Sequence, residues 1–311
     1  MEVLSLAVDI GGTKMAAGLV SRSGRLTTVA TVPTSHPDDA EAEAEMLWSA
    51  LAGLVEGVLS QADGPVLACG VGCGGPMAGG GETVSPLNIP GWREFPLRRR
   101  LTGLTGLATF VDNDAKALAL GEGWMGAARG RTDYLAMVVS TGVGGGIVLD
   151  GRLLDGRLGN AGHIGHVVVE PDGRRCACGG RGCLEAEASG TAIAAVTGRP
   201  AAEATVAVIE RTGTLVGRAV ASVATLLDLD LAVVAGSVAL GFGAPFFEAA
   251  RREVRARAGM PFSAGTRVVP AGLGGRGPLV GAGAVGWRGL DEGAVDDGVG
   301  AQPARRWGGG G

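Results

Sequence analysis

Asp9-Ile10-Gly11-Gly12-Thr13-Lys14 places a diglycine between two apolar segments near the start of the chain. It follows the short apolar run Val3–Val8, which predicts a strand, and it leads into a second predicted strand at Met15–Ser21. A third strand is expected at Leu26–Val32, across the Ser23-Gly24 turn. A P-loop and a dinucleotide-binding turn both enter a helix, so this strand–diglycine–strand order excludes both.

The diglycine turn has the composition of a phosphate-binding turn. Gly11 and Gly12 allow backbone N–H groups to approach a phosphate closely, and Thr13 adds a hydroxyl donor. Asp9, at the end of the strand, could hold a hydrated Mg²⁺ that bridges phosphates. The plainer alternative is an ordinary hairpin turn.

A second glycine-rich turn, Ser140-Thr141-Gly142-Val143-Gly144-Gly145-Gly146, repeats this arrangement. It follows a predicted strand at Tyr134–Val139 and leads to another at Ile147–Leu149. Its glycines also match a loose dinucleotide fingerprint, but no helix follows. The opening order of three strands, a helix and a strand is therefore echoed from Tyr134 onward. Two such turns imply two related domains with phosphates in the cleft between them.

The remaining elements follow from apolar periodicity and from glycine and proline punctuation. A helix is expected at Asp38–Asp63, with Asp38 or Asp39 as its cap. A glycine-rich irregular segment is expected at 151–190, and a polar, disordered tail from Asp291 onward. The other expected elements are strands at Val66–Val71, Ala108–Val111, Leu231–Ala235 and Arg267–Val269, and helices at Asp114–Met125, about 212–227, about 246–258 and near Pro278–Trp287.

Asp112-Asn113-Asp114-Ala115 stands where a predicted strand meets a predicted helix. Asp and Asn are good helix caps, so one interpretation is capping. The functional interpretation is a carboxylate general base beside an amide that holds sugar hydroxyls.

The cysteines provide the strongest single signal. Cys176, Cys178 and Cys183 lie within eight residues, and His166 precedes them closely. A Cys₃His set is typical of a closed structural zinc site, in which four protein ligands leave no position for an activated water. Free cysteines in a loop are the alternative.

Composition limits the class of protein. The chain has 311 residues, which favours two domains, and a formal net charge of −4, which argues against nucleic-acid binding. No apolar run reaches the roughly 18 residues that span a bilayer. The first nine residues lack the basic region of a signal peptide, and five cysteines do not make a disulfide framework. We therefore expect a cytoplasmic protein that neither binds nor crosses a membrane.

Taken together, the motifs resemble the ROK family of bacterial sugar kinases and repressors, in family order from Asp9 to about Trp287. The resemblance implies an α/β, actin-like ATPase (ribonuclease-H-like) fold with two α/β domains flanking a cleft. The implied division is a small domain at 1–112, to which the last helix near 278–290 returns, a large domain at 113–277 with the zinc-stabilised loop, and a disordered tail at 291–311.

The resemblance also implies residue roles. Asp114 would take the proton from the 6-hydroxyl of a hexose, and His166 would bind zinc through one ring nitrogen and face the sugar with the other. ATP, Mg²⁺ and a structural Zn²⁺ are the implied substrate and ions. The implied sugar-binding residues are Gly75, Asn88, Asn113, Asp114, His163, His166 and Glu185; the implied ATP-binding residues are Asp9, Gly11, Gly12, Thr13, Lys14, Thr141, Gly142 and Gly236; the implied zinc ligands are His166, Cys176, Cys178 and Cys183.

Two residues depart from the family pattern. His163 stands where the family usually has a Glu that contacts the 2/3 side of the hexose. This exchange suggests a substrate altered at C2 or C3, such as kanosamine or an N-acylated hexosamine, with glucose as the alternative. Lys116 replaces a common Asn, and its plainest interpretation is a solvated side chain.

The sequence disfavours three competing functions. Repressors of the family carry a DNA-binding domain ahead of the first phosphate motif, and only eight residues precede Asp9. A non-catalytic sugar sensor would be expected to lose the base or a phosphate turn, and a nicotinamide enzyme is disfavoured by the strand context of both turns. An ATP-dependent hexose kinase is the leading interpretation. Homodimers or homotetramers, common in the family, and polyphosphate as phosphoryl donor both remain open.

Overall fold

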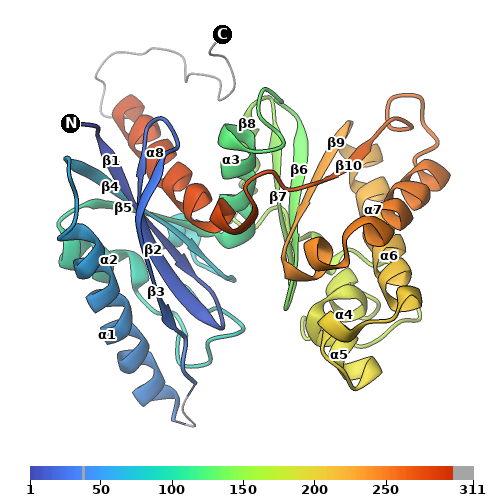
Figure 1. The fold of residues 1–311 in the computed structure, drawn as a ribbon, viewed down its shortest axis with the longest axis horizontal. Helices are drawn as coiled ribbons and strands as arrows, with labels where there is room; N and C mark the ends of the chain where they lie inside the picture. Colours follow the sequence, from blue (N-terminus) through green and yellow to red (C-terminus); the bar gives the residue numbers. More distant parts are fainter. Residues whose placement is uncertain (37–38, 297–311) are drawn as a thin grey trace. The chain divides into compact units, whose positions relative to one another are not determined.

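The structure is a computed structural model that describes residues 1–36 and 39–296 (Figure 1). Within these ranges the chain divides into two compact units, each with its own mixed five-stranded sheet. The first unit contains Met1–Met125, Asp155–Ala161 and the chain from Gly275 onward, and the second contains Gly126–Leu154 and Gly162–Gly274. The boundaries expected from the sequence stay a prediction, because compact units need not fold independently.

The first unit is built on a sheet of order β3-β2-β1-β4-β5. Strands β1, β2 and β3 are antiparallel neighbours, whereas β4 and β5 lie parallel to β1. Its elements are β1 (Leu4–Ile10), β2 (Lys14–Ser21), β3 (Leu26–Pro33), α1 (Ala40–Leu59), β4 (Val66–Cys73), α2 (Leu97–Thr105), β5 (Ala108–Asn113), α3 (Asp114–Met125) and α8 (Gly277–Asp296).

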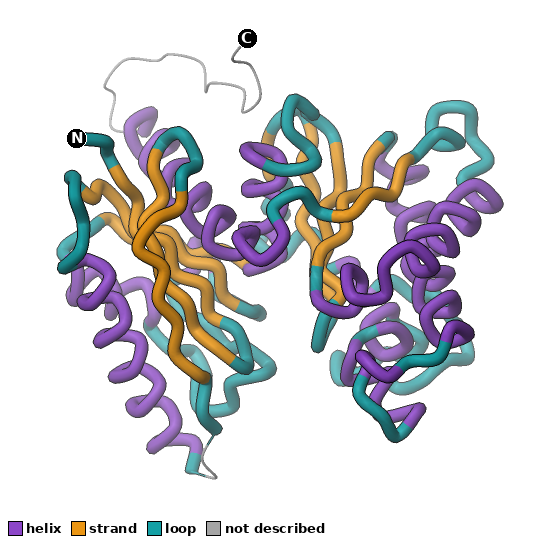
Figure 2. The backbone as a smooth tube through the Cα atoms, viewed as in Figure 1, coloured by secondary structure: helices purple, strands orange, loops and turns teal. Residues whose placement is uncertain are grey.

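Helices cover both faces of this sheet (Figure 1, Figure 2). One face packs against α1 through alternating apolar residues such as Leu6, Val8 and Val71. The other face carries α8, which approaches the backbone closely: a Cβ on Gly70 would lie 2.0 Å from the carbonyl oxygen of Ala282. Glycine at this position therefore sets how near the last helix lies to the sheet.

The second unit repeats the order of the first. Its sheet runs β10-β9-β6-β7-β8, with β6, β7 and β8 antiparallel and with β9 and β10 parallel to β6. This agreement confirms the α/β class and the internal echo expected from the sequence. The elements are β6 (Tyr134–Val139), β7 (Val143–Leu149), β8 (Arg152–Leu153), α4 (Leu184–Ala188), α5 (Gly190–Thr197), α6 (Val206–Leu227), β9 (Leu231–Ala235), α7 (Ser237–Arg257) and β10 (Arg267–Pro270).

Several boundaries differ from expectation. Asp39 caps α1 through bonds to the N–H groups of Glu41 and Ala42, while Asp38, the alternative cap, lies outside the described residues. Helix α7 begins at Ser237 instead of about 246. The kink at Gly243 and the proline Pro245, which come before the expected start, both lie inside the helix. Helix α8 continues to Asp296, and the rest of the expected tail lies outside the described residues. The segment at 151–190, expected to be irregular, contains α4. Helix α2 was not expected from the sequence. None of the described helices is long and apolar enough to span a membrane.

Lys116 contradicts the expectation of a solvated side chain. It is 2 % exposed, and its ammonium donates to three oxygens: Asp112 Oδ1 at 2.9 Å, Asp155 Oδ1 at 2.7 Å and the Gly159 carbonyl at 3.1 Å. Arg288 also binds Asp155, at 2.7 Å. Burial raises the pKa of Asp112, and the charge of Lys116 opposes that shift. The network ties the segment Asp155–Ala161 to the start of α3.

Replacing Lys116 with Met is expected to destabilise the first unit by about 3–5 kcal/mol, because Asp112 and Asp155 lose the buried cation that compensates them. Urea denaturation followed by tryptophan fluorescence measures this, since the described tryptophans, Trp48, Trp92, Trp124 and Trp287, all lie in the first unit. The matched control is Arg25→Met, which removes an exposed ion pair with Glu2 and is expected to cost less than about 1 kcal/mol. Equal losses in the two variants would contradict the role given to Lys116.

Candidate functional site

The carboxyl ends of β1 and β5 bring Asp9 and Asp114 near one another in the first unit. The strand register places Asp9 beside Gly72 on β4, and Gly72 beside Asp112 on β5. A Cβ on Gly72 would lie 3.8 Å from Asp9 Oδ1 and 3.5 Å from the Cα of Asp114. Gly72 thus leaves space between the two acidic residues that any other side chain would occupy.

The electrostatics of this pair are unfavourable without a cation. Burial, followed by the charge of Asp114, raises the pKa of Asp9 to about 7, and Lys14 opposes the shift. A second carboxylate near the poorly solvated one disfavours full ionisation of both. A divalent cation would remove that conflict, and carboxylate oxygens are the ligands that Mg²⁺ prefers.

Asn113 and Asp114 serve the start of α3 as well as the candidate site. Asn113 Oδ1 and Asp114 Oδ1 both accept the backbone N–H of Ala115, at 3.0 and 2.8 Å. The capping interpretation therefore describes real contacts. It does not compete with the functional one, because Asp114 is still exposed and its carboxylate is fixed in orientation.

The first phosphate turn is held by short backbone contacts between β1 and β2. Gly11 donates its N–H to the Lys14 carbonyl at 3.1 Å, and the Thr34 hydroxyl donates to the Gly11 carbonyl at 2.8 Å. Thr13 and Lys14 are exposed. A Cβ on Gly12 would lie 2.5 Å from Asn88 Nδ2, so the turn lies directly against the predicted sugar-side residue.

Asn88 and Gly75 lie in the loop that follows β4. A Cβ on Gly74 would lie 3.6 Å from Asn88 Oδ1, which places the amide beside the first turn of this loop. Gly75 comes next and is joined to Pro76 by a cis peptide bond. The first unit therefore gathers Asp9–Lys14, Asn88 and Asp114 around the carboxyl edge of its sheet, and Gly75 lies in the same loop as Asn88.

The second phosphate turn joins β6 to β7 in the second unit. Gly190 donates its N–H to the Ser140 carbonyl at 2.7 Å, and Thr191 donates its hydroxyl to the Thr141 carbonyl at 3.0 Å. The hydroxyls of Ser140 and Ser237 are 2.9 Å apart, which brings the turn beside the start of α7. Gly236 precedes that helix at φ 99°, and a Cβ there would lie 2.3 Å from the Val139 carbonyl oxygen.

Glu185 connects the predicted sugar-binding residues of this unit to its phosphate turn. Its Oε2 accepts the backbone N–H of Val143 at 2.9 Å. A Cβ on Gly142 would lie 2.8 Å from the same oxygen. The carboxylate therefore lies directly against the turn that Thr141 and Gly142 form.

His163 and His166 lie on one short turn that packs against the start of β7. Their ring centroids are 6.1 Å apart, with 22° between the ring planes. A Cβ on Gly165, between them, would lie 2.2 Å from the Val143 carbonyl oxygen. His163 is exposed and His166 is half-buried.

The three cysteines converge on His166. One ligand atom from each of the four residues lies within 4.8 Å of the others, and Cys176 Sγ is 3.7 Å from His166 Nδ1. Burial raises the pKa of Cys183 to about 12, so this thiol loses its proton readily only when a cation takes the proton's place. Three thiolates and an imidazole are the donor set of a closed structural zinc site, and these residues could hold such an ion.

The contacts also reveal functional candidates that the sequence analysis missed. Asp112, at the end of β5, lies only four residues before Lys116 on α3, so this ion pair is local in sequence. Asp155 is 39 residues from Lys116, and no local signal links the two. His36, which contacts the first phosphate turn at Gly12, and its partner Glu43 were missed for the same reason.

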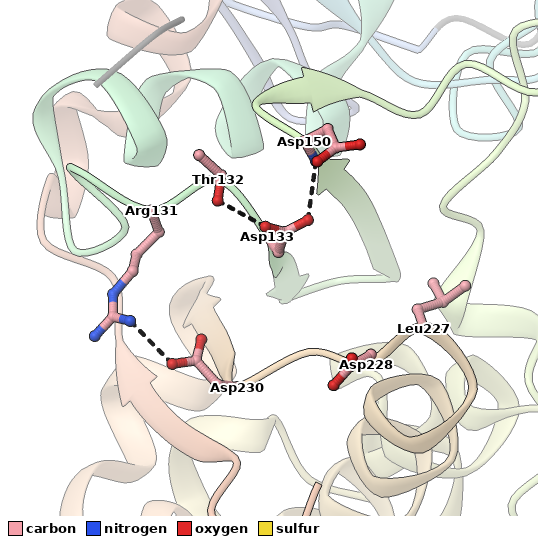
Figure 3. A pocket seen from close by; sticks show the side chains of 7 residues that line it. All are labelled: Arg131, Thr132, Asp133, Asp150, Leu227, Asp228 and Asp230. Carbon is pink, nitrogen blue, oxygen red and sulfur yellow. Dashed lines mark hydrogen bonds and ion pairs between the residues drawn. The ribbon is translucent and has the colours of Figure 1, made fainter. Parts of the chain in front are cut away.

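A separate polar pocket lies in the second unit (Figure 3). Asp133 accepts the Thr132 hydroxyl at 2.6 Å and the Asp150 N–H at 2.9 Å, while Arg131 binds Asp230 at 2.9 Å. The residues expected for the functional site are not among those that line this pocket. The lining residues are Arg131, Thr132, Asp133, Asp150, Leu227, Asp228 and Asp230.

Comparison with known proteins identifies relatives across nearly the whole chain. The model of the ROK family matches residues 5–286. The ROK family glucokinase from Streptomyces griseus, solved with glucose and AMPPNP, shares 32 % identity and a TM-score of 0.78, and the match covers 92 % of this chain and 99 % of that one. The ROK hexokinase from Thermus thermophilus shares 33 % identity and a TM-score of 0.77, and the match covers 93 % of this chain and 99 % of that one. These likenesses confirm the actin-like ATPase fold.

Two kinds of sugar kinase occur among the relatives found by sequence. An N-acetylmannosamine kinase from Citrobacter koseri is 39 % identical over 254 residues, which cover 77 % of this chain and 85 % of the relative. A glucokinase from Thermotoga maritima is 42 % identical over 192 residues, which cover 60 % of this chain and 58 % of the relative. The match therefore spans less than two thirds of that glucokinase.

The two histidines of one turn offer a matched test of the metal-binding set. His166→Asn is expected to reduce bound metal well below the about one ion per chain of a closed four-ligand site. His163→Asn, three residues away and outside the set, is expected to leave metal content unchanged. Elemental analysis after gel filtration measures both. Equal metal content in the two variants would exclude His166 as a ligand.

Proposed function

Because the chain belongs to the ROK family of sugar kinases, we propose that it transfers the γ-phosphoryl group of ATP to the 6-hydroxyl of glucose or of a glucose-like amino sugar. The observation that carries this proposal is the approach of Asp9 to Asp114 beside the diglycine turn. A non-catalytic sugar sensor of the same family is the alternative. A sensor would not need an exposed carboxylate with a fixed orientation at the start of α3.

Asp114 is the proposed general base. Its carboxylate is exposed, and the Ala115 N–H fixes Oδ1 at 2.8 Å. In the proposed step it accepts the proton of the sugar 6-hydroxyl as the oxygen attacks the γ-phosphorus. Phosphoryl transfer requires alignment and charge neutralisation more than covalent help, so a fixed carboxylate is a sufficient acceptor.

Hydrogen-bonding groups of the first unit, and separately of the second, are proposed to contact sugar hydroxyls. Asn113, Asn88 and the backbone around Gly75 are the proposed contacts in the first unit, with His163, His166 and Glu185 in the second. Glu185 is bonded to Val143 N, so the same carboxylate that receives a sugar hydroxyl also supports a phosphate turn. This arrangement favours a sugar and a nucleotide that are bound together.

The phosphates are proposed to bind the two glycine turns. The first set is Asp9, Gly11, Gly12, Thr13 and Lys14, and the second is Thr141 and Gly142, with Gly236 on the adenosine side. Bound Mg²⁺ supplies neutralisation of the phosphate charge, and it would keep Asp9 ionised despite the raised pKa of that group.

The metal-binding set is proposed to hold structural zinc through His166, Cys176, Cys178 and Cys183. Zinc, when bound, stabilises the loop and fixes one tautomer of the His166 ring. Because Nδ1 is the ring nitrogen near Cys176 Sγ, Nε2 is left to face the sugar. His166 would thus orient the substrate through a nitrogen whose protonation the metal determines.

The sugar is proposed to be altered at C2 or C3. His163 stands exposed on the turn that carries His166, where a neutral or cationic ring replaces an acidic side chain of the family pattern. Kanosamine and N-acylated hexosamines are the candidate substrates, and an N-acetylmannosamine kinase among the relatives is consistent with this choice. We also propose a cytoplasmic reaction with small-molecule partners, without nucleic acid or membrane, by a homodimer or a homotetramer.

Asp114→Asn tests the base. The variant is expected to bind sugar with nearly unchanged affinity and to lose about 10²–10⁴-fold in turnover, because the amide cannot accept the proton. Coupled ADP assays measure turnover, and calorimetry measures sugar binding. Asp291→Asn, which removes an exposed ion pair with Arg22, is the control. Near-normal turnover of Asp114→Asn would refute this assignment.

His163→Glu tests the substrate proposal. Restoring the acidic group is expected to raise the ratio of kcat/KM for glucose to kcat/KM for amino sugars, because the C2/C3 side of the pocket then regains its carboxylate acceptor. A hydrogen bond to a charged group is worth about 1.5–3 kcal/mol, which corresponds to a change of about 10–150-fold in such a ratio. An unchanged ratio across glucose, N-acetylmannosamine, N-acetylglucosamine and kanosamine would show that His163 does not select the sugar.

A further inference from the structure

His36 forms a bridge between helix α1 and the first phosphate turn. Its Nδ1 is 2.6 Å from Glu43 Oε1, and its Nε2 is 2.7 Å from the carbonyl oxygen of Gly12. The other carboxylate oxygen of Glu43 accepts the backbone N–H of Gly91. The Glu43 side chain is 2 % exposed, whereas that of His36 is 39 % exposed. A buried acid and a partly exposed imidazole thus connect two segments that are 79 positions apart in sequence, Gly12 and Gly91.

The bridge requires one proton more than a neutral imidazole and a carboxylate contain together. A carbonyl oxygen and a carboxylate oxygen are both acceptors, so both ring nitrogens must be donors, unless the proton lies on Glu43 instead of Nδ1. In either case the pair holds that proton. When it is lost, the remaining ring proton is expected to stay on Nδ1 beside the carboxylate. Nε2 then turns a lone pair toward the Gly12 carbonyl, and that contact breaks.

The surroundings favour the protonated bridge. The Gly12 carbonyl and then Glu43 raise the pKa of His36 above its ordinary value. Among the described residues, Glu43 on α1 is the charged group that faces the ring, and the phosphate turn contributes a carbonyl dipole. A buried carboxylate is costly unless it is paired, so Glu43 also gains from the cation. The pKa of His36 is higher in the folded than in the unfolded protein. The bridge therefore contributes its full stabilisation of the fold below the unfolded pKa, and this contribution is lost as pH rises through the folded pKa.

The two ends of the bridge are the segments that the proposed function uses. Gly12 belongs to the turn proposed for phosphate, and Gly91 lies in the loop that contains Asn88. Asn88 in turn contacts Gly12, since a Cβ on that glycine would lie 2.5 Å from Asn88 Nδ2. The loop and the turn are therefore joined twice, directly through Asn88 and indirectly through Glu43 and His36.

We propose that His36 and Glu43 are positioning residues that couple nucleotide binding at Gly11–Gly12 to sugar binding at the loop of Asn88, and that the coupling requires the shared proton. The proposal rests on the proposed function, because it takes these two segments as the nucleotide and sugar sites. An ordered phosphate turn then favours an ordered loop, and an ordered loop favours an ordered turn, because linkage between two sites is reciprocal.

The kinetic test compares the pH dependence of kcat/KM for Mg·ATP in four proteins: the wild type, His36→Gln, Glu43→Gln and Glu45→Gln. In the wild type kcat/KM is expected to rise as Asp9 ionises near pH 7 and to fall on the order of 5-fold at higher pH as the bridge opens. His36→Gln is expected to lack the falling limb and to show the raised KM for ATP at every pH, with kcat changed less than 2-fold, about the resolution of the assay.

Glu45→Gln is the matched control, because Glu45 lies on α1 two positions from Glu43 but pairs with Arg100 in solvent. It is expected to keep the wild-type profile. ATP and Asp9 titrate in all four proteins, so the comparison between variants isolates the bridge. A falling limb that persists in His36→Gln, or that disappears in Glu45→Gln, would overturn the proposal. His36→Gln keeps the test decisive if Glu43→Gln does not fold.

Calorimetry tests the coupling itself. In the wild type, a saturating sugar is expected to lower the dissociation constant of AMPPNP about 5-fold or more, and in His36→Gln this factor is expected to approach one. The same factor in both proteins would contradict a role for the bridge.

A measurement on the resting protein separates this inference from the proposed function. The ¹⁵N NMR signals of the histidine rings are compared with those of His36→Gln, which identifies His36. We expect His36 to give imidazolium signals that persist well above pH 6.5 and that respond to MgADP. This result does not depend on knowing the sugar substrate. A ring that titrates at or below about 6.5, the value of a solvated histidine, would overturn the bridge. Absence of any phosphorylation by the wild type with such a ring present would refute the proposed function alone.

Discussion

The repulsion between the carboxylates of Asp9 and Asp114 is the constraint on which the candidate site of the first unit depends. Strand register places the two acids on either side of Gly72, and burial of Asp9 leaves water a poor source of compensation for its charge. A third acid, Asp112, lies two residues before Asp114, and Lys116 and Arg288 compensate its charge. A divalent cation beside Asp9 would offset the burial and the repulsion that raise the pKa of this group, and binding of Mg·ATP would bring such a cation.

A carboxylate also links each phosphate turn to residues proposed for sugar binding. In the second unit the link is direct, because Glu185 accepts the N–H of Val143 within the turn. In the first unit it passes through His36, which contacts Gly12 and Glu43. Hydrogen bonds to charged groups are stronger and more directional than neutral ones. Such links give each turn a defined position before phosphate arrives, which lowers the cost of ordering it in the bound state.

The sequence could predict those features whose signals are local. The bounds of α3, β6 and β9 agree with expectation because glycine, aspartate or charged residues delimit each apolar run, and the metal-binding set could be proposed because three cysteines lie within eight residues. Helix α2 was missed since its three consecutive arginines obscure the apolar face. The burial of Lys116 and the bridge at His36 depend on partners far along the chain, and periodicity carries no signal for such contacts. The internal repeat could be predicted because the glycine turns repeat, whereas the spatial order of the strands in each sheet was not predicted.

Whether this chain is a sugar kinase with Asp114 as its base is tested by ³¹P NMR of the products formed from Mg·ATP. The sugars are glucose, N-acetylmannosamine, N-acetylglucosamine and kanosamine, and Asp114→Ala serves as the blank. We expect a sugar 6-phosphate from at least one of these sugars, together with an equal amount of ADP, and neither product in the blank. ATP that remains intact with every sugar, in a protein that still binds sugar, would contradict this expectation and would favour a sensor.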